Sequence, residues 1–352
     1  MVLACLPLGA QHAWIEYQPK HELPPVIDGN SAAVWWQGEL VLFHSDSRPT
    51  LSRGPDQFNL SPAIPVNFVT DEPKTVWIEA AWADPEGSIL VWYHTEPRAC
   101  DGRLAAPQIG AGISLDGGYT VYDLGIVLRA GDEPNCQAQN GFFASGHGDF
   151  SVVLDPTSGY FYFYFTNYAG PASGQGVVAA RLAYEDRFGP VGRVAKFHEG
   201  AWESPGLDGP LSAIFPATKT WDRADTDSFW GPSVHFNEHL GVWVMLLNRA
   251  CCAPEWPQAG IYLSFAPQLD SPAAWQAPRL LLARGQLIHL PGFYPQILGL
   301  GPNGTDTLGG EVSRLYVQGM SIWNLRFSWD EPPPQEEEDL DDSPHMFQHP
   351  RR

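Results

Sequence analysis

The chain has 352 residues, of which 44% are hydrophobic, and it carries 40 acidic against 20 basic residues for a formal net charge of −20. So acidic a chain repels nucleic acid and anionic membranes, which excludes both classes of partner. No apolar run is long enough to cross a bilayer, because a spanning helix needs about 20 residues. The 35 glycines and 33 prolines are typical of many short strands joined by turns.

The first 23 residues show no clear periodic pattern and are expected to form an irregular lead-in. Their opening, MVLACLPLGAQHAW, resembles the end of an export signal or a lipoprotein box at Cys5, although it is short and lacks a basic leading region. This favours a secreted or periplasmic location and leaves a cytoplasmic one open.

Between residues 24 and 329 one pattern occurs five times. Each copy has a polar start, an apolar strand, a turn with glycine and a second strand rich in aromatic residues. The copies are VIDGNSAAVWWQGELVLFHS, VWIEAAWADPEGSILVWYHTEP, GHGDFSVVLDPTSGYFYFYFTNY, FWGPSVHFNEHLGVWVMLLN, and FYPQILGLG with SRLYVQGMSIWNL. Such repetition is typical of β-propellers, in which each unit is one blade. We therefore predict an all-β fold, a five-bladed β-propeller.

Equivalent points in the five copies are expected at the starts of the innermost strands, close to a common axis. They are Asp28, Glu79, Asp149, Trp230 and Tyr294. Carboxylates crowded around one axis push each other's pKa values apart, which supplies a proton donor and a base near neutral pH. The mouth of the central channel is therefore the predicted working face.

The last segment, residues 330–352, is rich in proline and acidic residues and is predicted to be a disordered tail. The five cysteines match neither a zinc motif nor a disulfide framework. We interpret them as buried free thiols. A bond between the adjacent Cys251 and Cys252 is the alternative.

The repeats resemble those of the five-bladed glycoside hydrolases of families 43 and 32. Hairpins of the kind found on outer strands in those families occur in ISLDGGYTV, from Ile113, and in LSFAPQLDSPAAW, from Leu263. The first of them also resembles the Asp-box of sialidases, whose propellers have six blades. The count of five units favours the first resemblance, which implies a sugar-cleaving or sugar-binding propeller.

The resemblance to family 43 implies catalytic roles for three acids. Asp28 matches the general base that opens the first blade, and Asp149 matches the acid of the third blade that orients the sugar. The general acid of the fourth blade is missing, because the chain reads Trp230-Gly231-Pro232-Ser233 where the family has Glu-Gly-Pro. Glu79, at the start of the second blade, is the expected substitute as proton donor.

Four further residues are candidates for substrate binding, namely His147, Trp230, His235 and Tyr294. An imidazole can also donate a proton, so the two histidines are alternative donors to Glu79. His235 can also ligate a structural divalent cation in the central channel, as in some family 43 propellers. The alternative is structural: histidines bonded to blade backbones, and aromatic rings that pack between blades. The identity of any metal ligands stays open.

Two classes of function remain. The first is a glycosidase acting on a glycan or oligosaccharide through Asp28, Glu79 and Asp149, with no required cofactor. The second is a non-catalytic carbohydrate-binding or scaffold propeller that has lost the fourth-blade acid. Convergence of the three carboxylates on an open pocket favours the first, whereas a pocket plugged by Trp230 favours the second. A monomer is expected in either case.

Overall fold

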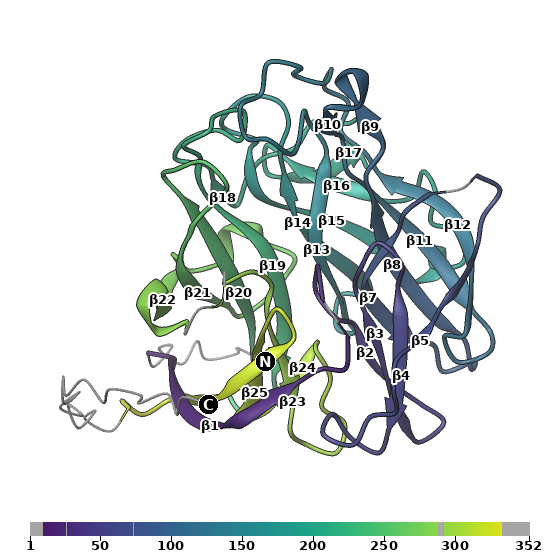
Figure 1. Cartoon of the computed structure of the whole chain (residues 1–352), viewed down its shortest axis with the longest axis vertical. Coiled ribbons are helices and arrows are strands. Elements are labelled where there is room, and N and C mark those ends of the chain that lie inside the picture. The colour runs from purple at the N-terminus through teal and green to yellow at the C-terminus, as the bar shows by residue number, and fades with distance from the viewer. Residues whose placement is uncertain (1–9, 26, 73, 288–289, 291, 333–352) are drawn as a thin grey trace, which may run out of the picture.

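The computed structural model describes residues 10–25, 27–72, 74–287, 290 and 292–332 (Figure 1). Within these ranges the strands form five large sheets and one two-stranded ribbon. The strands β2, β7, β13, β19 and β23, one from each sheet, lie innermost, and contacts join β2 to β7, β7 to β13, β13 to β19 and β19 to β23. The prediction of an all-β, five-bladed propeller is therefore confirmed.

The blades are described here from the inner strand outward. Blade I comprises β2 (Ala33–Trp36), β3 (Glu39–His44), β4 (Thr50–Gly54) and β5 (Ile64–Pro65). Blade II comprises β7 (Trp77–Ala83), β8 (Ile89–Thr95), β11 (Gln108–Ser114) and β12 (Thr120–Leu128), with β6 (Asn67–Val69) at its edge. Blade III comprises β13 (His147–Asp155), β14 (Tyr160–Asn167), β15 (Gly176–Ala183), β16 (Ala195–His198) and β17 (Ala201–Pro205), and β18 (Phe215–Pro216) pairs with β15.

The last two blades complete the ring. Blade IV comprises β19 (Asp227–Asn237), β20 (Val242–Cys251), β21 (Gln258–Ala266) and β22 (Arg279–Ala283), and β24 (Leu308–Gly309) pairs with β19. Blade V comprises β23 (Pro295–Gly299), β25 (Val312–Val317), β26 (Met320–Ser328) and β1 (His12–Glu22). Outside the blades lie the ribbon β9 (Arg98–Ala99) and β10 (Leu104–Ala105), and the short 3-10 turns η1 (Cys100–Gly102), η2 (Tyr184–Asp186), η3 (Pro272–Ala274) and η4 (Arg284–Gln286).

The N-terminal segment corrects one expectation. Residues 1–23 were expected to be irregular, but His12–Glu22 forms β1, which pairs antiparallel with β26 and is the outer strand of blade V. Figure 1 shows β1 beside the C-terminal strands of the chain. The first and last strands thus close the ring. From residue 333 onward, the tail predicted for residues 330–352 lies outside the described residues.

The core is divided among the joints between blades. Each of five buried apolar clusters draws its members from two adjacent blades, for example Trp92 of blade II with Phe161 and Phe163 of blade III. Alternating side chains put one face of each strand into one joint and the other face into the next. On the axis, the Asn30 amide donates to the carbonyls of Phe150 (2.9 Å) and Pro232 (3.1 Å) and so links blades III and IV.

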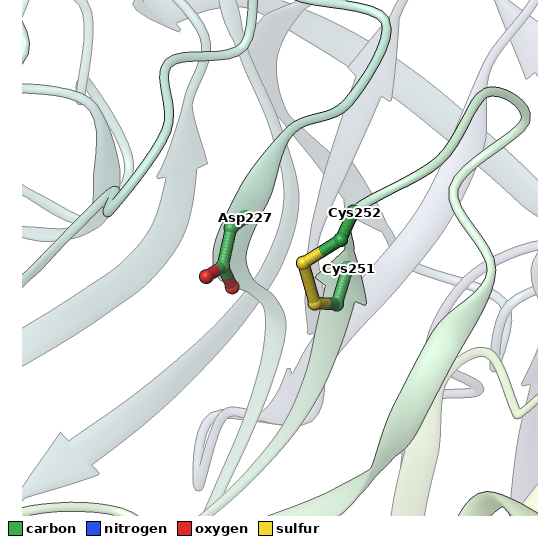
Figure 2. A group of neighbouring side chains, drawn as sticks. All are labelled: Asp227, Cys251 and Cys252. Atoms are coloured by element: carbon green, nitrogen blue, oxygen red, sulfur yellow. A yellow bond between two sulfur atoms is a disulfide. The ribbon is translucent and has the colours of Figure 1, made fainter.

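Four of the five cysteines form disulfides, so the expectation of free thiols is wrong for these four. Cys100 is bonded to Cys136, and Cys251 is bonded to the adjacent Cys252, as Figure 2 shows for the second pair. Cys5 lies outside the described residues. Among the described residues, no helix has the length and apolar character needed to cross a membrane.

Candidate active site

A cavity of about 250 Å³ lies where the inner strands begin, at one mouth of the channel. Its polar lining consists of four carboxyl side chains and one imidazole, those of Asp28, Glu96, Asp149, Glu255 and His94. Its remaining walls are the aromatic side chains of Trp77, Phe142, Phe143, Trp230, Trp256, Phe293 and Tyr294. The cavity is therefore an acidic site enclosed by aromatic rings, a lining that suits the polar edges and apolar faces of a sugar.

Three of the inner strands are irregular at the site. The pairing register shifts around Glu79 in β7, around Asp149 in β13, and between Trp230 and Ser233 in β19. Asp149 has a left-handed backbone, with φ of 46°. A bulge adds a residue to one strand and re-aims its side chain, and bulges occur often beside active sites. These bulges aim the site's side chains away from the regular alternation of the strands.

Asp28 lies in the segment before β2, and residues from three other segments of the chain pack closely around it. Its carboxyl oxygens lie 3.4 Å from the indole nitrogen of Trp77 and 3.4 Å from the hydroxyl of Tyr294. The next residue, Gly29, has φ of 143°, and a Cβ there would lie 2.4 Å from the Ser45 hydroxyl oxygen. Only glycine fits this position, which fixes the course of the chain next to Asp28.

Glu79 lies beneath the cavity and does not line it. One carboxyl oxygen is paired with Nδ1 of His94, and the other accepts the backbone N–H of Phe150 at 2.9 Å. Burial lowers the pKa of His94, but the Glu79 carboxylate, together with the negative charges of Asp149 and Glu96, outweighs burial and the pKa is raised to about 9. Both oxygens of Glu79 are therefore occupied in a buried ion pair. This geometry does not suit the donor role expected from the sequence.

Asp149 lines the cavity in a buried position that favours its protonated form. Burial and the negative charge of Glu79 raise its pKa to about 7. One carboxyl oxygen accepts a hydrogen bond from the hydroxyl of Tyr168, whose own pKa is raised by burial, so the phenol stays the donor. The other oxygen accepts no hydrogen bond from any described residue. The proton of Asp149 is therefore directed to this second oxygen.

Glu96 follows β8 and is half-buried at the cavity wall. Burial raises its pKa, the positive charge of His94 lowers it, and the nearby Asp28 raises it further. The net direction is upward. The negative charge of Asp28 thus favours the protonated form of Glu96, as expected for crowded carboxylates.

Trp230 occupies the place where the resemblance to family 43 predicts the general acid. It is buried, donates its indole N–H to Gln258 at 2.9 Å, and packs with ring centroids 5.8 Å from Trp256 and 5.6 Å from Tyr294. Trp230 and Tyr294 are therefore walls of the cavity, and the cavity is present beside them.

Two predicted residues lie elsewhere. His147 is buried and lines a separate cavity of about 350 Å³ together with Asn167 and His198. His235 is buried against Phe327, and burial lowers its pKa to about 3. Neither histidine lines the central cavity, so neither is placed to bind substrate or to donate a proton there.

The cation expected at His235 stays a prediction. His235 belongs to no cluster of three or more potential metal-binding side chains in this part of the chain. The one cluster found among the described residues is Asp227 with Cys251 and Cys252 (Figure 2). Its sulfurs are bonded to each other and Asp227 is paired with Arg249 at 2.9 Å, so this cluster offers no free thiolates.

Several residues of the site were missed in the sequence. His94 lies near the end of β8 and Glu96 directly follows it, and β7 pairs with β8 so that Trp77 lies opposite His94. The sequence could have predicted them, because in an antiparallel hairpin the end of the second strand lies beside the start of the first. Tyr168 follows β14 in the same way and ends the third repeat, whereas Glu255 and Phe142 reach the site from loops, for which the repeat pattern gives no position.

The fold is shared with solved structures of glycoside hydrolases. A thermostable family 43 glycoside hydrolase is 11% identical, with a TM-score of 0.51, over 87% of this chain and 92% of that one. An exo-1,5-α-L-arabinanase from a bovine ruminal metagenomic library is 10% identical, with a TM-score of 0.51, over 87% and 93%. The family 43 YxiA protein of Bacillus licheniformis is 12% identical, with a TM-score of 0.50, over 87% and 72%. At these identities the likeness establishes the propeller fold.

Two other comparisons give no relative. No protein-family model matches the chain, and no curated protein matches it.

Proposed function

We propose that the protein is a glycoside hydrolase with Asp149 as the proton donor and Asp28 as the base. The observation that carries the proposal is that these two carboxyl groups line one aromatic cavity in different environments. Asp149 is buried with a pKa of about 7, whereas Asp28 is exposed within the cavity. A carboxyl group that holds a proton, beside a second one that can accept a proton, is the chemical requirement for cleaving a glycosidic bond.

In the proposed reaction, Asp149 gives its proton to the glycosidic oxygen as the bond to the anomeric carbon breaks. Asp28 accepts a proton from a water molecule, whose oxygen forms the new bond to that carbon. The products are two sugars with free hydroxyl groups, and the proton on Asp28 returns to Asp149 through solvent. Glu79 does not touch the substrate. It lies beneath the cavity and acts as a positioning residue, because its negative charge raises the pKa of Asp149.

The proposal exchanges two roles expected from the sequence. Glu79, the expected donor, is paired with His94 beneath the cavity, and Asp149, the expected orienting residue, has the raised pKa and a free oxygen. The shared fold supports a glycan as substrate, and one neighbour is an exo-1,5-α-L-arabinanase. Arabinan-derived oligosaccharides are therefore the first substrates to test.

A screen of aryl glycosides and of arabinan-, xylan- and galactan-derived oligosaccharides tests this function. Wild type should release sugar from at least one of them. Asp28→Asn and Asp149→Asn should each lose about 10²- to 10⁴-fold in kcat/KM, the usual contribution of an acid or base. Asp149→Asn should lose less on aryl glycosides with good leaving groups, because these need little protonation. Equal losses on both substrate types would reassign the donor.

A non-catalytic sugar-binding propeller is the second candidate, and one observation favours it. The fourth blade has Trp230 in place of the acid expected from family 43, and Trp230 is a buried wall. If wild type binds oligosaccharides by calorimetry and hydrolyses none, this second function replaces the first.

We further propose that the protein works in an oxidising compartment, outside the cell or in a periplasm. Two disulfides within one chain support this, because disulfides persist where glutathione and thioredoxin do not reduce them. The expected monomeric state and the lack of a required cofactor stay predictions.

A further inference from the structure

The cavity extends outward beyond its catalytic acids to a rim formed by two loops. The first loop carries Phe142, which is 45% exposed, and the second carries Glu255, which is exposed, and Trp256. All three residues line the cavity, and the rings of Phe142 and Trp256 lie 4.6 Å apart. We call Phe142, Glu255 and Trp256 the outer rim. It presents an exposed aromatic ring and an exposed carboxyl group to the same cavity.

The loop that carries Phe142 is fixed at several points. The Cys100–Cys136 disulfide ties it to the η1 turn, in the connection between β8 and β11 of blade II. The side-chain oxygen of Asn140 accepts the N–H groups of Phe142 (2.7 Å) and Phe143 (2.8 Å), and the carbonyl of Phe142 accepts the N–H of Ala105 at 2.9 Å. A ring held in this way loses little conformational entropy when a ligand stacks on it.

The loop that carries Glu255 and Trp256 begins at the bond between Cys251 and Cys252 (Figure 2). The N–H of Cys251 donates to the carbonyl of Pro257 at 3.0 Å, and the N–H of Cys252 donates to the carbonyl of Thr226 at 3.1 Å. One hydrogen bond therefore closes the base of the loop, a second ties its start to Thr226, and the disulfide stiffens the Cys251–Cys252 pair itself.

The backbone of this second loop is unusual. Cys252, Glu255 and Trp256 have positive φ values of 87°, 65° and 51°. Non-glycine residues in this region are costly and persist where surrounding structure enforces them, often at ligand sites. The enforcing contacts are visible: Trp256 is 6% exposed, and its ring lies 4.7 Å from Trp221 and 5.8 Å from Trp230. The strained loop thus has a fixed position relative to the catalytic cavity.

We propose that the outer rim is a second sugar subsite, which binds the next unit of a neutral glycan chain and is held in place by the two disulfides. The exposed face of Phe142 packs on the apolar face of the sugar ring, and the carboxyl group of Glu255 accepts hydrogen bonds from its hydroxyls. The net charge of −20 and the acids of the cavity select against acidic sugars such as uronates. This inference rests on the proposed function for the identity of the ligand as a glycan.

Binding of arabinan-, xylan- and galactan-derived oligosaccharides of one to six units, measured by calorimetry, tests the subsite. Phe142→Ala and Glu255→Gln should each weaken the binding of oligosaccharides about tenfold, the factor that one aromatic or polar contact supplies. Both should weaken the binding of the matching monosaccharide by much less. Uronate oligomers of equal length should bind more weakly than neutral ones.

Two matched controls are available. Tyr119 is another partly exposed aromatic residue, 43% exposed on the blade II hairpin, and Glu238 is an exposed acid after β19. Neither lines the cavity, so Tyr119→Ala and Glu238→Gln should leave oligosaccharide binding unchanged. The double variant Cys251→Ser/Cys252→Ser should weaken oligosaccharide binding as Glu255→Gln does, after circular dichroism has shown that it is folded.

The outcomes separate this inference from the proposed function. Equal weakening for monosaccharides and oligosaccharides, no weakening in Phe142→Ala and Glu255→Gln, or binding of no oligosaccharide by wild type would each overturn the subsite. Oligosaccharide binding that depends on the outer rim without any hydrolysis would support the subsite and overturn the proposed glycosidase.

Discussion

At the scale of single residues, the site depends on how buried charges are paired. Glu79 and His94 form an ion pair beneath the cavity, and Asp149 lies beside the negative member of that pair. Burial favours the neutral form of Asp149, and Glu79 adds electrostatic repulsion in the same direction. A carboxyl group that stays protonated near neutral pH is therefore a consequence of its neighbours and not of its position in the sequence.

The pH dependence of activity follows from this arrangement. The proton donor must be protonated, so kcat/KM should fall as the pH rises past about 7, the pKa of Asp149. In Glu79→Gln the repulsion that raises this pKa is removed, and the alkaline limb should move to lower pH. Rate profiles against pH for the two proteins measure the shift. Glu238→Gln is the control, and an unmoved limb in Glu79→Gln would reject Glu79 as the tuning residue.

Stability should also depend on pH through His94. Its pKa is raised from 6.5 to about 9 in the folded protein, so the folded state binds the proton more tightly than the unfolded state. The stabilisation is complete below pH 6.5 and is lost as the pH rises through about 9. Urea unfolding between pH 6 and 10 should show this decline in wild type and a smaller decline in His94→Gln. If the free energy of unfolding declines equally with pH in both proteins, the pH dependence does not come from His94.

At the scale of elements, tight turns and bulges place the acids. The inner strands β7, β13 and β19 each have a register shift at the cavity, and Asp28 lies at a turn whose next residue must be glycine. A regular strand would send alternate side chains into the two blade joints. The bulges interrupt this alternation, which permits acids and aromatic rings to face the axis instead.

Gly29→Ala tests the turn beside Asp28. The new Cβ would lie 2.4 Å from the Ser45 hydroxyl oxygen at a φ of 143°, so we expect a loss of about 2 kcal/mol or more in the free energy of unfolding. Gly87→Ala is the matched control, because Gly87 also has a positive φ of 96° but a Cβ there would meet nothing within 4 Å. Thermal and urea unfolding compare the two. Equal losses would show that backbone conformation, and not the close approach, determines the cost.

At the scale of the whole molecule, the ring is closed by strands from the two ends of the chain. Strand β1 pairs with β26, and Ile15 of β1 packs on the apolar cluster shared by blades IV and V. The site draws its lining from all five blades, since Asp28, Trp77, Asp149, Trp230 and Tyr294 belong to different units. The geometry of the cavity therefore depends on closure of the ring.

Ile15→Asn should lower stability by about 2 kcal/mol, because it places an amide against the apolar cluster. Tyr17→Asn lies on the same strand, but Tyr17 is 63% exposed, so this variant should remain within about 0.5 kcal/mol of wild type. Melting temperatures of the two variants provide the measurement. If the melting temperatures of the two variants fall equally, the packing of Ile15 is not what holds β1 on blade V.

The sequence by itself determined the class of the fold, the number of blades and the approximate starts of the inner strands. Strand alternation and turn residues are local, so a repeat is visible in one dimension. It also identified Asp28 and Asp149 as acids near the axis, because equivalent points of a repeat must converge.

Only the tertiary structure decided what each residue does at the axis. Glu79 is paired with His94 and lies under the cavity, His147 and His235 are buried away from it, and Glu96 and Glu255 line it. The bulges, the Cys100–Cys136 disulfide and the use of β1 in blade V also appear only when segments apart in the sequence meet. A pKa, a cavity and a bond between strands each depend on distances between residues far apart in the chain, and a local pattern does not contain those distances.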